Sequence, residues 1–143
     1  MFKKIIGVLM LYLVFFESPG QLVTETKQQN SFSVSNAVIY VDPADHALVR
    51  RSAELLQQDI QLVTGKKPAI INRIVPGSQG NIIIVGSIER SSIVKELITR
   101  KKIGASIKGK WEAYRVESIK VPFTGFKNGL IIMGSDRRGT AYG

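Results

Sequence analysis

The sequence predicts an α+β fold, a two-layer α/β sandwich in which helices pack against a mixed sheet. Short apolar runs typical of strands alternate with segments of helical periodicity, which gives the element order β-α-β-β-α-β-β-α. Hydrophobic residues make up 44% of the chain and charged residues 22%, a composition that excludes a disordered protein. A length of 143 residues suits a single domain.

The N-terminal residues 1–20 have the pattern of a secretory signal peptide. Two lysines precede a nearly unbroken apolar run over residues 5–16, and a proline and small residues end that run. The run is shorter than the about twenty residues that cross a bilayer, so it does not predict a membrane anchor. We expect cleavage after Gly20, export to a periplasm or out of the cell, a polar leader over residues 21–31 and a domain over residues 32–143.

The net charge of +9 at pH 7 is the most skewed property of the composition. The basic residues form only small clusters, and no basic run typical of a nucleic-acid-binding arm is present. The charge therefore indicates a solvated surface that favours an acidic partner, and not DNA or RNA. The chain has no cysteine, which excludes a lipid-modified lipoprotein start, disulfides and thiolate metal sites.

A strand and a long amphipathic helix open the domain. The strand is apolar over residues 37–41, and Asp42 with Pro43 after it predicts an N-cap and a first helical position. The helix is expected over residues 44–64, and Gly65 is expected to end it in a left-handed C-cap. Its spacing predicts a core-facing stripe of Val49, Ala53, Leu56, Ile60 and Val63, widened by Leu48, Leu55 and Leu62.

Two strands and a second helix follow. Residues 69–74 and 81–85 are separated by a short loop with the spacing of a hairpin, although the second run is apolar enough to be buried on both faces. Ser91 or Ser92 is expected to cap the second helix, which ends in the basic cluster at residues 100–102. The helices are expected to pack on one face of the sheet.

The last third of the domain predicts two strands and the start of a helix. Residues 111–121 carry polar side chains on both sides, as in an edge strand. Residues 130–133 form an apolar strand, and Ser135 or Asp136 is expected to cap a helix at residues 137–143. Because only about two turns of this helix are present, we expect it to be incomplete and the structural unit to continue further.

Few motifs point to chemistry. The glycine spacing at residues 134–139 is that of a phosphate loop, but Thr140 occupies the lysine position, and Gly86 with Ser87 is explained by a tight turn. His46 is the one histidine, and we expect it on the surface of the first helical turn. We therefore expect no metal site, no cofactor site and no Ser-His-Asp arrangement.

The carboxylates and the tryptophan are the residue types that could serve glycoside chemistry. A glycosidase needs two carboxylates facing each other across a pocket, and most of the eleven here have local roles at helix starts, on helices or on a strand. The sequence offers no such pair. Trp111 is either a sugar-stacking platform or, as we favour, a residue that covers the edge of a core.

Three stretches, in this order and spacing, resemble the N-terminal domain of glycoside hydrolase family 115. They are residues 81–87 followed by 91–93, residues 107–112 and residues 133–143, and the resemblance spans roughly residues 35–143. The family comprises secreted enzymes that remove α-1,2-linked glucuronic acid, or its 4-O-methyl form, from xylan side chains. The closing Arg-Gly-x-x-Tyr-Gly pattern is also similar to the end of the small domain that precedes the barrel in glycosidase families 20 and 67.

The resemblance implies an accessory role and not a catalytic one. In the family, acid and base residues belong to a (β/α)8 barrel that follows this domain, so it implies no catalytic residue in this chain. It implies that Arg137, Arg138 and Tyr142 lie where the domain meets the barrel. The chain is then the N-terminal part of a xylan α-glucuronidase, cut short before its barrel and inactive by itself, whose partners are that barrel and, through the parent enzyme, glucuronoxylan.

A second hypothesis remains open. The chain is in that case a free-standing secreted carbohydrate-binding module for acidic polysaccharide. Its positive surface and the aromatic residues Trp111, Phe123 and Phe126 would hold the glycan.

Overall fold

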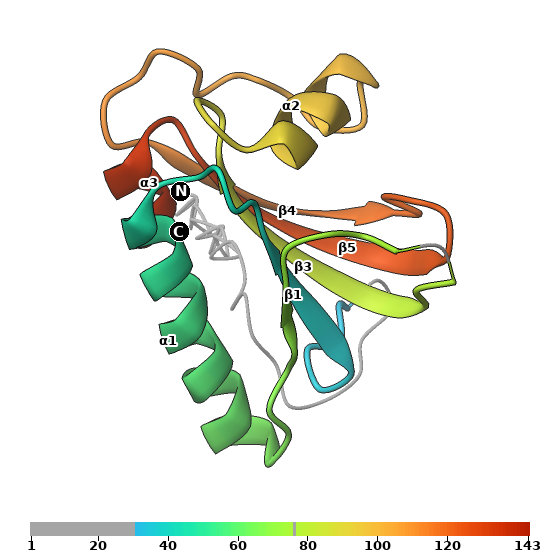
Figure 1. The fold of residues 1–143 in the computed structure, drawn as a ribbon. Helices are drawn as coiled ribbons and strands as arrows, with labels where there is room; N and C mark the ends of the chain where they lie inside the picture. The colour runs from blue at the N-terminus through green and yellow to red at the C-terminus, as the bar shows by residue number, and fades with distance from the viewer. Residues whose placement is uncertain (1–30, 76) are drawn as a thin grey trace, which may run out of the picture.

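The computed structural model describes residues 31–75 and 77–143 (Figure 1). The expected signal peptide, and the expected leader apart from its last residue, lie outside this described part. The elements follow the predicted order: β1 (Ala37–Val41), α1 (Ala47–Thr64), β2 (Ile70–Ile71), β3 (Gly80–Ser87), α2 (Ser92–Thr99), β4 (Tyr114–Lys120), β5 (Phe126–Gly134) and α3 (Arg137–Tyr142). In the described residues, no helix is long and apolar enough to cross a membrane.

The predicted α+β sandwich with a mixed sheet is confirmed. The five strands lie in the order β2-β1-β3-β5-β4, in which β4 alone runs antiparallel to its neighbour. The predicted hairpin between residues 69–74 and 81–85 is wrong, because β2 and β3 both pair with β1 in parallel, on opposite sides of it. The unbroken apolar run Ile82–Val85 is buried, as a central strand requires.

The sheet carries helices on both faces, where the sequence analysis expected them on one (Figure 1). The crossover from β1 to β2 and the chain from β3 to β5 run in opposite directions across the sheet. Because parallel crossovers are right-handed, the helices α1 and α2 then lie on opposite faces. One core packs α1 against Ile39, Ile83 and Ile132, and the other packs α2 against Ile84 and Met133.

Helix α1 begins at Ala47 and not at residue 44, and fewer of its apolar side chains are buried than the spacing predicted. Asp42 does not cap it, because its carboxylate accepts hydrogen bonds from Ala44 and from the start of α2, and His46 occupies the N-cap position. The expected left-handed C-cap at Gly65 is confirmed by its φ of 71°.

The predicted stripe on α1 is correct at its centre and wrong at its end. Val49, Ala53 and Ile60 are buried, and Leu56 packs partly against the same core. Val63 is 80% exposed, because β2 has only two residues and offers no strand for the last turn to cover. The residues expected to widen the stripe, Leu48, Leu55 and Leu62, are exposed as well.

The caps of the two later helices agree with the sequence. The Ser91 hydroxyl accepts a hydrogen bond from the Val94 amide at 3.4 Å at the start of α2. Of the two candidates for α3, Asp136 is the N-cap, and its carboxylate accepts from the Gly139 amide at 2.7 Å. The expected edge strand is β4, but it begins at Tyr114 and leaves Trp111 in the preceding loop.

Candidate functional site

The loops that follow β1, β3 and β5 meet at one edge of the sheet. These strands are parallel, so their carboxyl ends lie together. The chain leaves β1 toward one side of the sheet and leaves β3 toward the other, which makes the edge between them a topological switch point. In open α/β sheets, ligands bind in the crevice outside the carboxyl ends of the strands at such a point.

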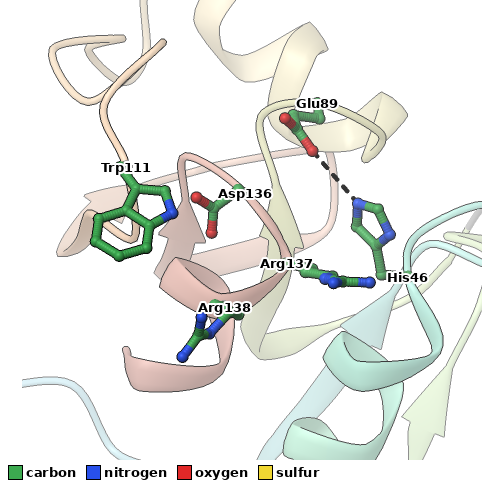
Figure 2. A pocket seen from close by; sticks show the side chains of 6 residues that line it. All are labelled: His46, Glu89, Trp111, Asp136, Arg137 and Arg138. Carbon is green, nitrogen blue, oxygen red and sulfur yellow. Dashed lines mark hydrogen bonds and ion pairs between the residues drawn. The ribbon is translucent and has the colours of Figure 1, made fainter.

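An open pocket of about 320 Å³ lies at this edge (Figure 2). Its lining residues are His46, Glu89, Trp111, Asp136, Arg137 and Arg138. The structure thus brings together the histidine, the tryptophan and two of the three residues expected at a domain interface. The third, Tyr142, lies one turn along α3, and its hydroxyl accepts a hydrogen bond from Arg138 at 3.3 Å.

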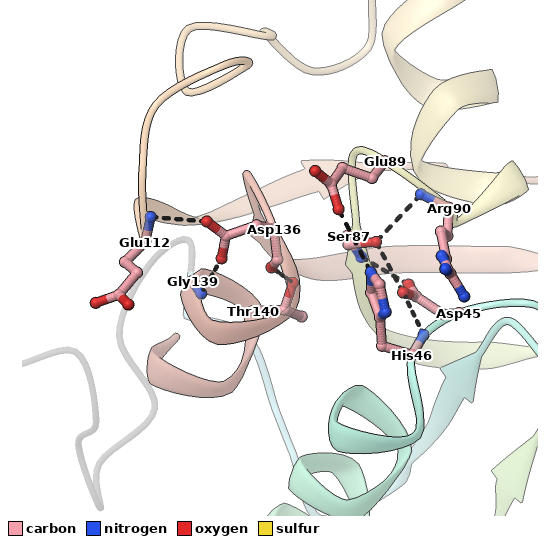
Figure 3. A network of polar contacts seen from close by, with 9 residues as sticks. All are labelled: Asp45, His46, Ser87, Glu89, Arg90, Glu112, Asp136, Gly139 and Thr140. Atoms are coloured by element: carbon pink, nitrogen blue, oxygen red, sulfur yellow. Dashed lines mark hydrogen bonds and ion pairs between the residues drawn. The ribbon is translucent and has the colours of Figure 1, made fainter.

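One wall of the pocket is fixed by a network around Asp45 (Figure 3). The Asp45 carboxylate accepts hydrogen bonds from both the amide and the hydroxyl of Ser87, each at 2.7 Å, and from the His46 amide at 2.8 Å. These bonds tie the loop after β1 to the end of β3. They place His46 Nε2 3.4 Å from a Glu89 carboxylate oxygen, so the two side chains form a pair across the loops.

His46 differs from its sequence expectation. Its side chain is 19% exposed and it occupies the N-cap position of α1, so it is a partly buried residue of the pocket and not a surface residue of the first turn. Over residues 31–75 and 77–143, no group of three or more His, Cys, Asp or Glu side chains is placed to hold a metal ion.

The opposite wall is organised by Asp136. One of its carboxylate oxygens accepts from the Gly139 amide at 2.7 Å and the other from the Glu112 amide at 2.8 Å (Figure 3). The hydrogen bonds from these two amides hold the pKa of Asp136 below its usual value, since they favour the charged carboxylate. Asp136 is therefore an ionised structural group that joins the loop before β4 to the start of α3.

The glycines of the apparent phosphate loop serve packing. A Cβ on Gly134 would lie 2.0 Å from the Thr140 amide nitrogen, and one on Gly139 would lie 2.3 Å from the Ala113 carbonyl oxygen. Helix α3 therefore approaches β5 and the segment before β4 more closely than a side chain permits. This close approach explains the glycine spacing without any phosphate.

Trp111 projects from a loop that is held at several points. It is 81% exposed, so the favoured expectation that it covers the edge of a core is wrong. The following residue, Glu112, has a φ of 50°, and its carboxylate lies 2.7 Å from Arg138. Ala113 and Ser135 exchange backbone and hydroxyl hydrogen bonds of 2.8 to 3.1 Å, which fix the loop beside α3.

The other two aromatic candidates for glycan binding are less accessible than Trp111. Phe126 is 2% exposed, and Phe123 is partly buried against the same core cluster. The two residues stand three positions apart in a short turn, and this spacing gave no signal of their burial. Trp111 is therefore the most exposed of the three aromatic candidates.

The pocket contains two carboxylates, Glu89 and Asp136, which the sequence analysis did not pair. They come from loops after different strands, and only the parallel pairing of β3 and β5 brings them together. A glycosidase needs one carboxylic acid with a raised pKa, whereas the pKa of Asp136 is lowered and both its oxygens are occupied. The arrangement suits binding better than proton transfer.

Comparison with known proteins connects the chain to a glycoside hydrolase. No protein-family model matches the chain, and no curated protein sequence matches it. A solved structure does: a family GH115 4-O-methyl-α-glucuronidase with specificity for decorated arabinogalactans, at 31% sequence identity and a TM-score of 0.53 over 77% of this chain. The match covers 12% of that enzyme, so this chain is similar to one small part of a much longer protein.

Proposed function

We propose that the chain is the N-terminal, non-catalytic domain of a secreted family 115 glycoside hydrolase that acts on glucuronic acid side chains of polysaccharides such as xylan. The observation that carries the proposal is the 31% identity over 77% of this chain with an α-glucuronidase of which it covers 12%. A single domain retained at this identity within a long enzyme fits an accessory role. The agreement with the motif resemblance at residues 81–87, 91–93, 107–112 and 133–143 supports the same family.

The chemistry of the pocket supports the non-catalytic part of the proposal. Asp136 is committed to capping α3 and holding the loop at Glu112. Glu89 is paired with His46 on a wall fixed by Asp45. Hydrolysis would then depend on an acid and a second carboxylate in the rest of the enzyme, about 5 to 10 Å apart around the glycosidic bond.

The same proposal gives α3 a role at a domain boundary. Arg137, Arg138 and Tyr142 are exposed on this helix, and Tyr142 is 54% exposed. Arg and Tyr are enriched among residues that dominate protein interfaces. We place the contact with the catalytic barrel on the side of α3 that carries Arg138 and Tyr142, with Arg138 oriented by its ion pair to Glu112 at 2.7 Å. Arg137 lies at the edge of that contact and extends toward His46 (Figure 2).

Export is a further part of the proposal. It is supported by the short apolar run over residues 5–16 between a lysine pair and a helix-breaking proline. N-terminal sequencing of protein recovered outside the cytoplasm should begin near Gln21. Exported protein that still begins at Met1 would contradict cleavage.

The decisive experiment is to read the coding DNA beyond codon 143 in all three frames. We expect a (β/α)8 barrel sequence there, and protein made from the coding sequence extended through that barrel should release glucuronic acid from glucuronoxylan or from decorated arabinogalactan. A locus with no barrel in any frame would refute the proposal and favour a free-standing binding module.

A further inference from the structure

We propose that the pocket between Trp111 and Arg137 is a binding site for a carboxylate-bearing pyranose, that is, a uronic acid residue of a polysaccharide. The site lies within this chain, and the inference stands whether or not the chain is part of a hydrolase. It concerns glycan binding without cleavage. The argument uses the exposed indole, the charge balance of the pocket and the fixed backbone beneath it.

The first observation is a presented tryptophan. An indole that is 81% exposed loses most of the stabilisation that its burial would supply, and the surrounding loop does not close over it. The backbone of the next two residues is fixed by hydrogen bonds from the Glu112 amide to Asp136 and from the Ala113 amide to Ser135. The main chain beside Trp111 is therefore fixed and the indole is left open to solvent. A pyranose ring has an apolar C–H face that stacks on such an exposed aromatic ring.

The backbone at this point is also strained. Glu112 has a φ of 50°, a left-handed conformation that is unfavourable for a residue with a side chain. The hydrogen bond to Asp136 and the ion pair to Arg138 hold it there. Strained residues of this kind cluster at active sites and ligand clamps, and this one is adjacent to Trp111 in the sequence.

The second observation is the charge balance of the lining (Figure 2). Glu89 is paired with His46, and Arg138 with Glu112. Asp136 accepts two backbone hydrogen bonds. These contacts account for every charged side chain of the lining except that of Arg137.

Arg137 is the cation of the lining that has no ion pair or hydrogen bond within the described residues. Figure 2 shows it extending from α3 toward His46. A free guanidinium offers a planar fork of N–H donors that matches a carboxylate bidentately, and this pairing is strong and directional. The net charge of +9 adds a long-range attraction for an acidic polymer.

The rest of the lining suits sugar hydroxyls. A hydroxyl donates and accepts, and the pocket offers the Glu89 carboxylate as acceptor and the Arg137 guanidinium as donor. A volume of about 320 Å³ is at the lower end of the range for small-molecule pockets, which fits one sugar ring with its substituents. The site is open, so it admits a residue within a chain.

The single tryptophan of the chain gives a direct assay, because fluorescence excited selectively at tryptophan reports on Trp111 alone. The full chain is titrated with a xylo-oligosaccharide carrying 4-O-methylglucuronic acid and, in parallel, with the same oligosaccharide after reduction of its carboxyl group. We expect a saturable change in emission with both sugars, and on the order of tenfold tighter binding of the acidic form. No saturable response to the acidic sugar at millimolar concentration would overturn the proposal.

Three variants assign the contacts, with affinity measured by calorimetry. Trp111→Ala should weaken binding of both sugars by on the order of tenfold or more while leaving the melting temperature unchanged, since the side chain is exposed. Arg137→Gln should remove the preference for the acidic sugar. The matched control Arg73→Gln removes the same charge from a different pocket and should preserve the preference.

The outcomes separate this inference from the proposed function. Acid preference that falls by the same amount in Arg137→Gln and in Arg73→Gln would show attraction by net charge only and would overturn the site, as would a preference that survives Arg137→Gln. Unchanged affinity of Trp111→Ala would do the same. Neither result bears on whether a barrel is encoded downstream, which the DNA sequence decides separately.

Discussion

The carboxylate of Asp42, at the end of β1, accepts hydrogen bonds from both the amide and the hydroxyl of Ser92, at the start of α2, and the amide contact is 2.7 Å. Asp42 is 5% exposed and also accepts from the Ala44 amide at 2.9 Å. One buried side chain therefore joins two loops at the carboxyl edge of the sheet. Asp42, which the sequence predicted as the N-cap of α1, therefore fixes the start of α2 instead.

The first prediction is that Asp42→Ala lowers the free energy of unfolding by about 2 to 4 kcal/mol, because it leaves buried backbone donors without an acceptor. Chemical denaturation at neutral pH measures the change. Asp59→Ala removes an exposed carboxylate from α1 and should fall within about 0.5 kcal/mol of the unchanged chain. Equal losses in the two variants would contradict the role of Asp42.

The second prediction concerns pH. Burial alone would raise the pKa of Asp42, but the hydrogen bonds from Ser92 and Ala44 outweigh burial and the net pKa is lowered. The unfolded chain then binds the proton more tightly than the folded chain, near its ordinary pKa of about 4. The stabilisation is complete above that pH and is lost as pH falls through the lowered folded-state pKa.

Urea midpoints measured between neutral and acid pH test this dependence. Asp42→Asn should show a shallower decline with falling pH than the unchanged chain, and Asp136, whose pKa is also lowered, should supply the remaining slope. A decline of the same steepness in both proteins would show that Asp42 is not responsible.

The third prediction separates the two sides of α1. Ile60 is 6% exposed and Leu62 is 83% exposed, although the sequence analysis placed both on one apolar face. Ile60→Ala should cost about 2 to 5 kcal/mol, and Leu62→Ala should be within about 0.5 kcal/mol of no effect. Similar shifts of the denaturation midpoint would mean that the helix is rotated from the position described.

Local signals account for what the sequence predicted correctly. The C-cap at Gly65, the N-caps at Ser91 and Asp136 and the buried centre of the α1 stripe depend on contacts within a few residues. The apolar run Ile82–Val85 predicted a central strand for the same reason, because burial on both faces is visible in composition.

Non-local pairing accounts for what the sequence did not predict. Residues 69–74 and 81–85 are close in sequence with a hairpin spacing, yet both pair with β1, and no local pattern distinguishes these outcomes. Asp42 followed by Pro43 has the sequence pattern of an N-cap, but its carboxylate accepts a hydrogen bond from Ser92, 50 residues away. The pocket depends on the same strand order, so it could not be assembled from the motifs.

The fourth prediction tests the close approach of α3 to the sheet. Gly134→Ala should cost about 3 kcal/mol or more, because the new methyl group would lie 2.0 Å from the Thr140 amide nitrogen, which is backbone and cannot move aside. Gly104→Ala is the control, since its nearest contact is 3.3 Å away at the end of the flexible Arg115 side chain. Thermal melts of both variants measure the difference. A melting temperature of Gly134→Ala equal to that of the unchanged chain would refute the packing explanation of the glycine spacing.

The fifth prediction concerns the two pocket carboxylates and hydrolysis. We expect the purified chain to release no glucuronic acid from glucuronoxylan or its oligosaccharides. Asp136 is held ionised by two backbone donors, so it does not supply the protonated acid that must meet the leaving oxygen. Product release, measured by chromatography, checks this.

Substitutions of the two pocket carboxylates, Asp136 and Glu89, should differ in their effect on stability. Asp136→Asn should lower the melting temperature, because one amide nitrogen replaces an oxygen that accepts from Gly139 or Glu112. Glu89→Gln should leave it nearly unchanged, because Glu89 is 55% exposed and its pair with His46 is a surface contact. Measurable turnover by the chain, abolished by Glu89→Gln without loss of folding, would overturn the proposal that this domain is non-catalytic and make this pocket an active site.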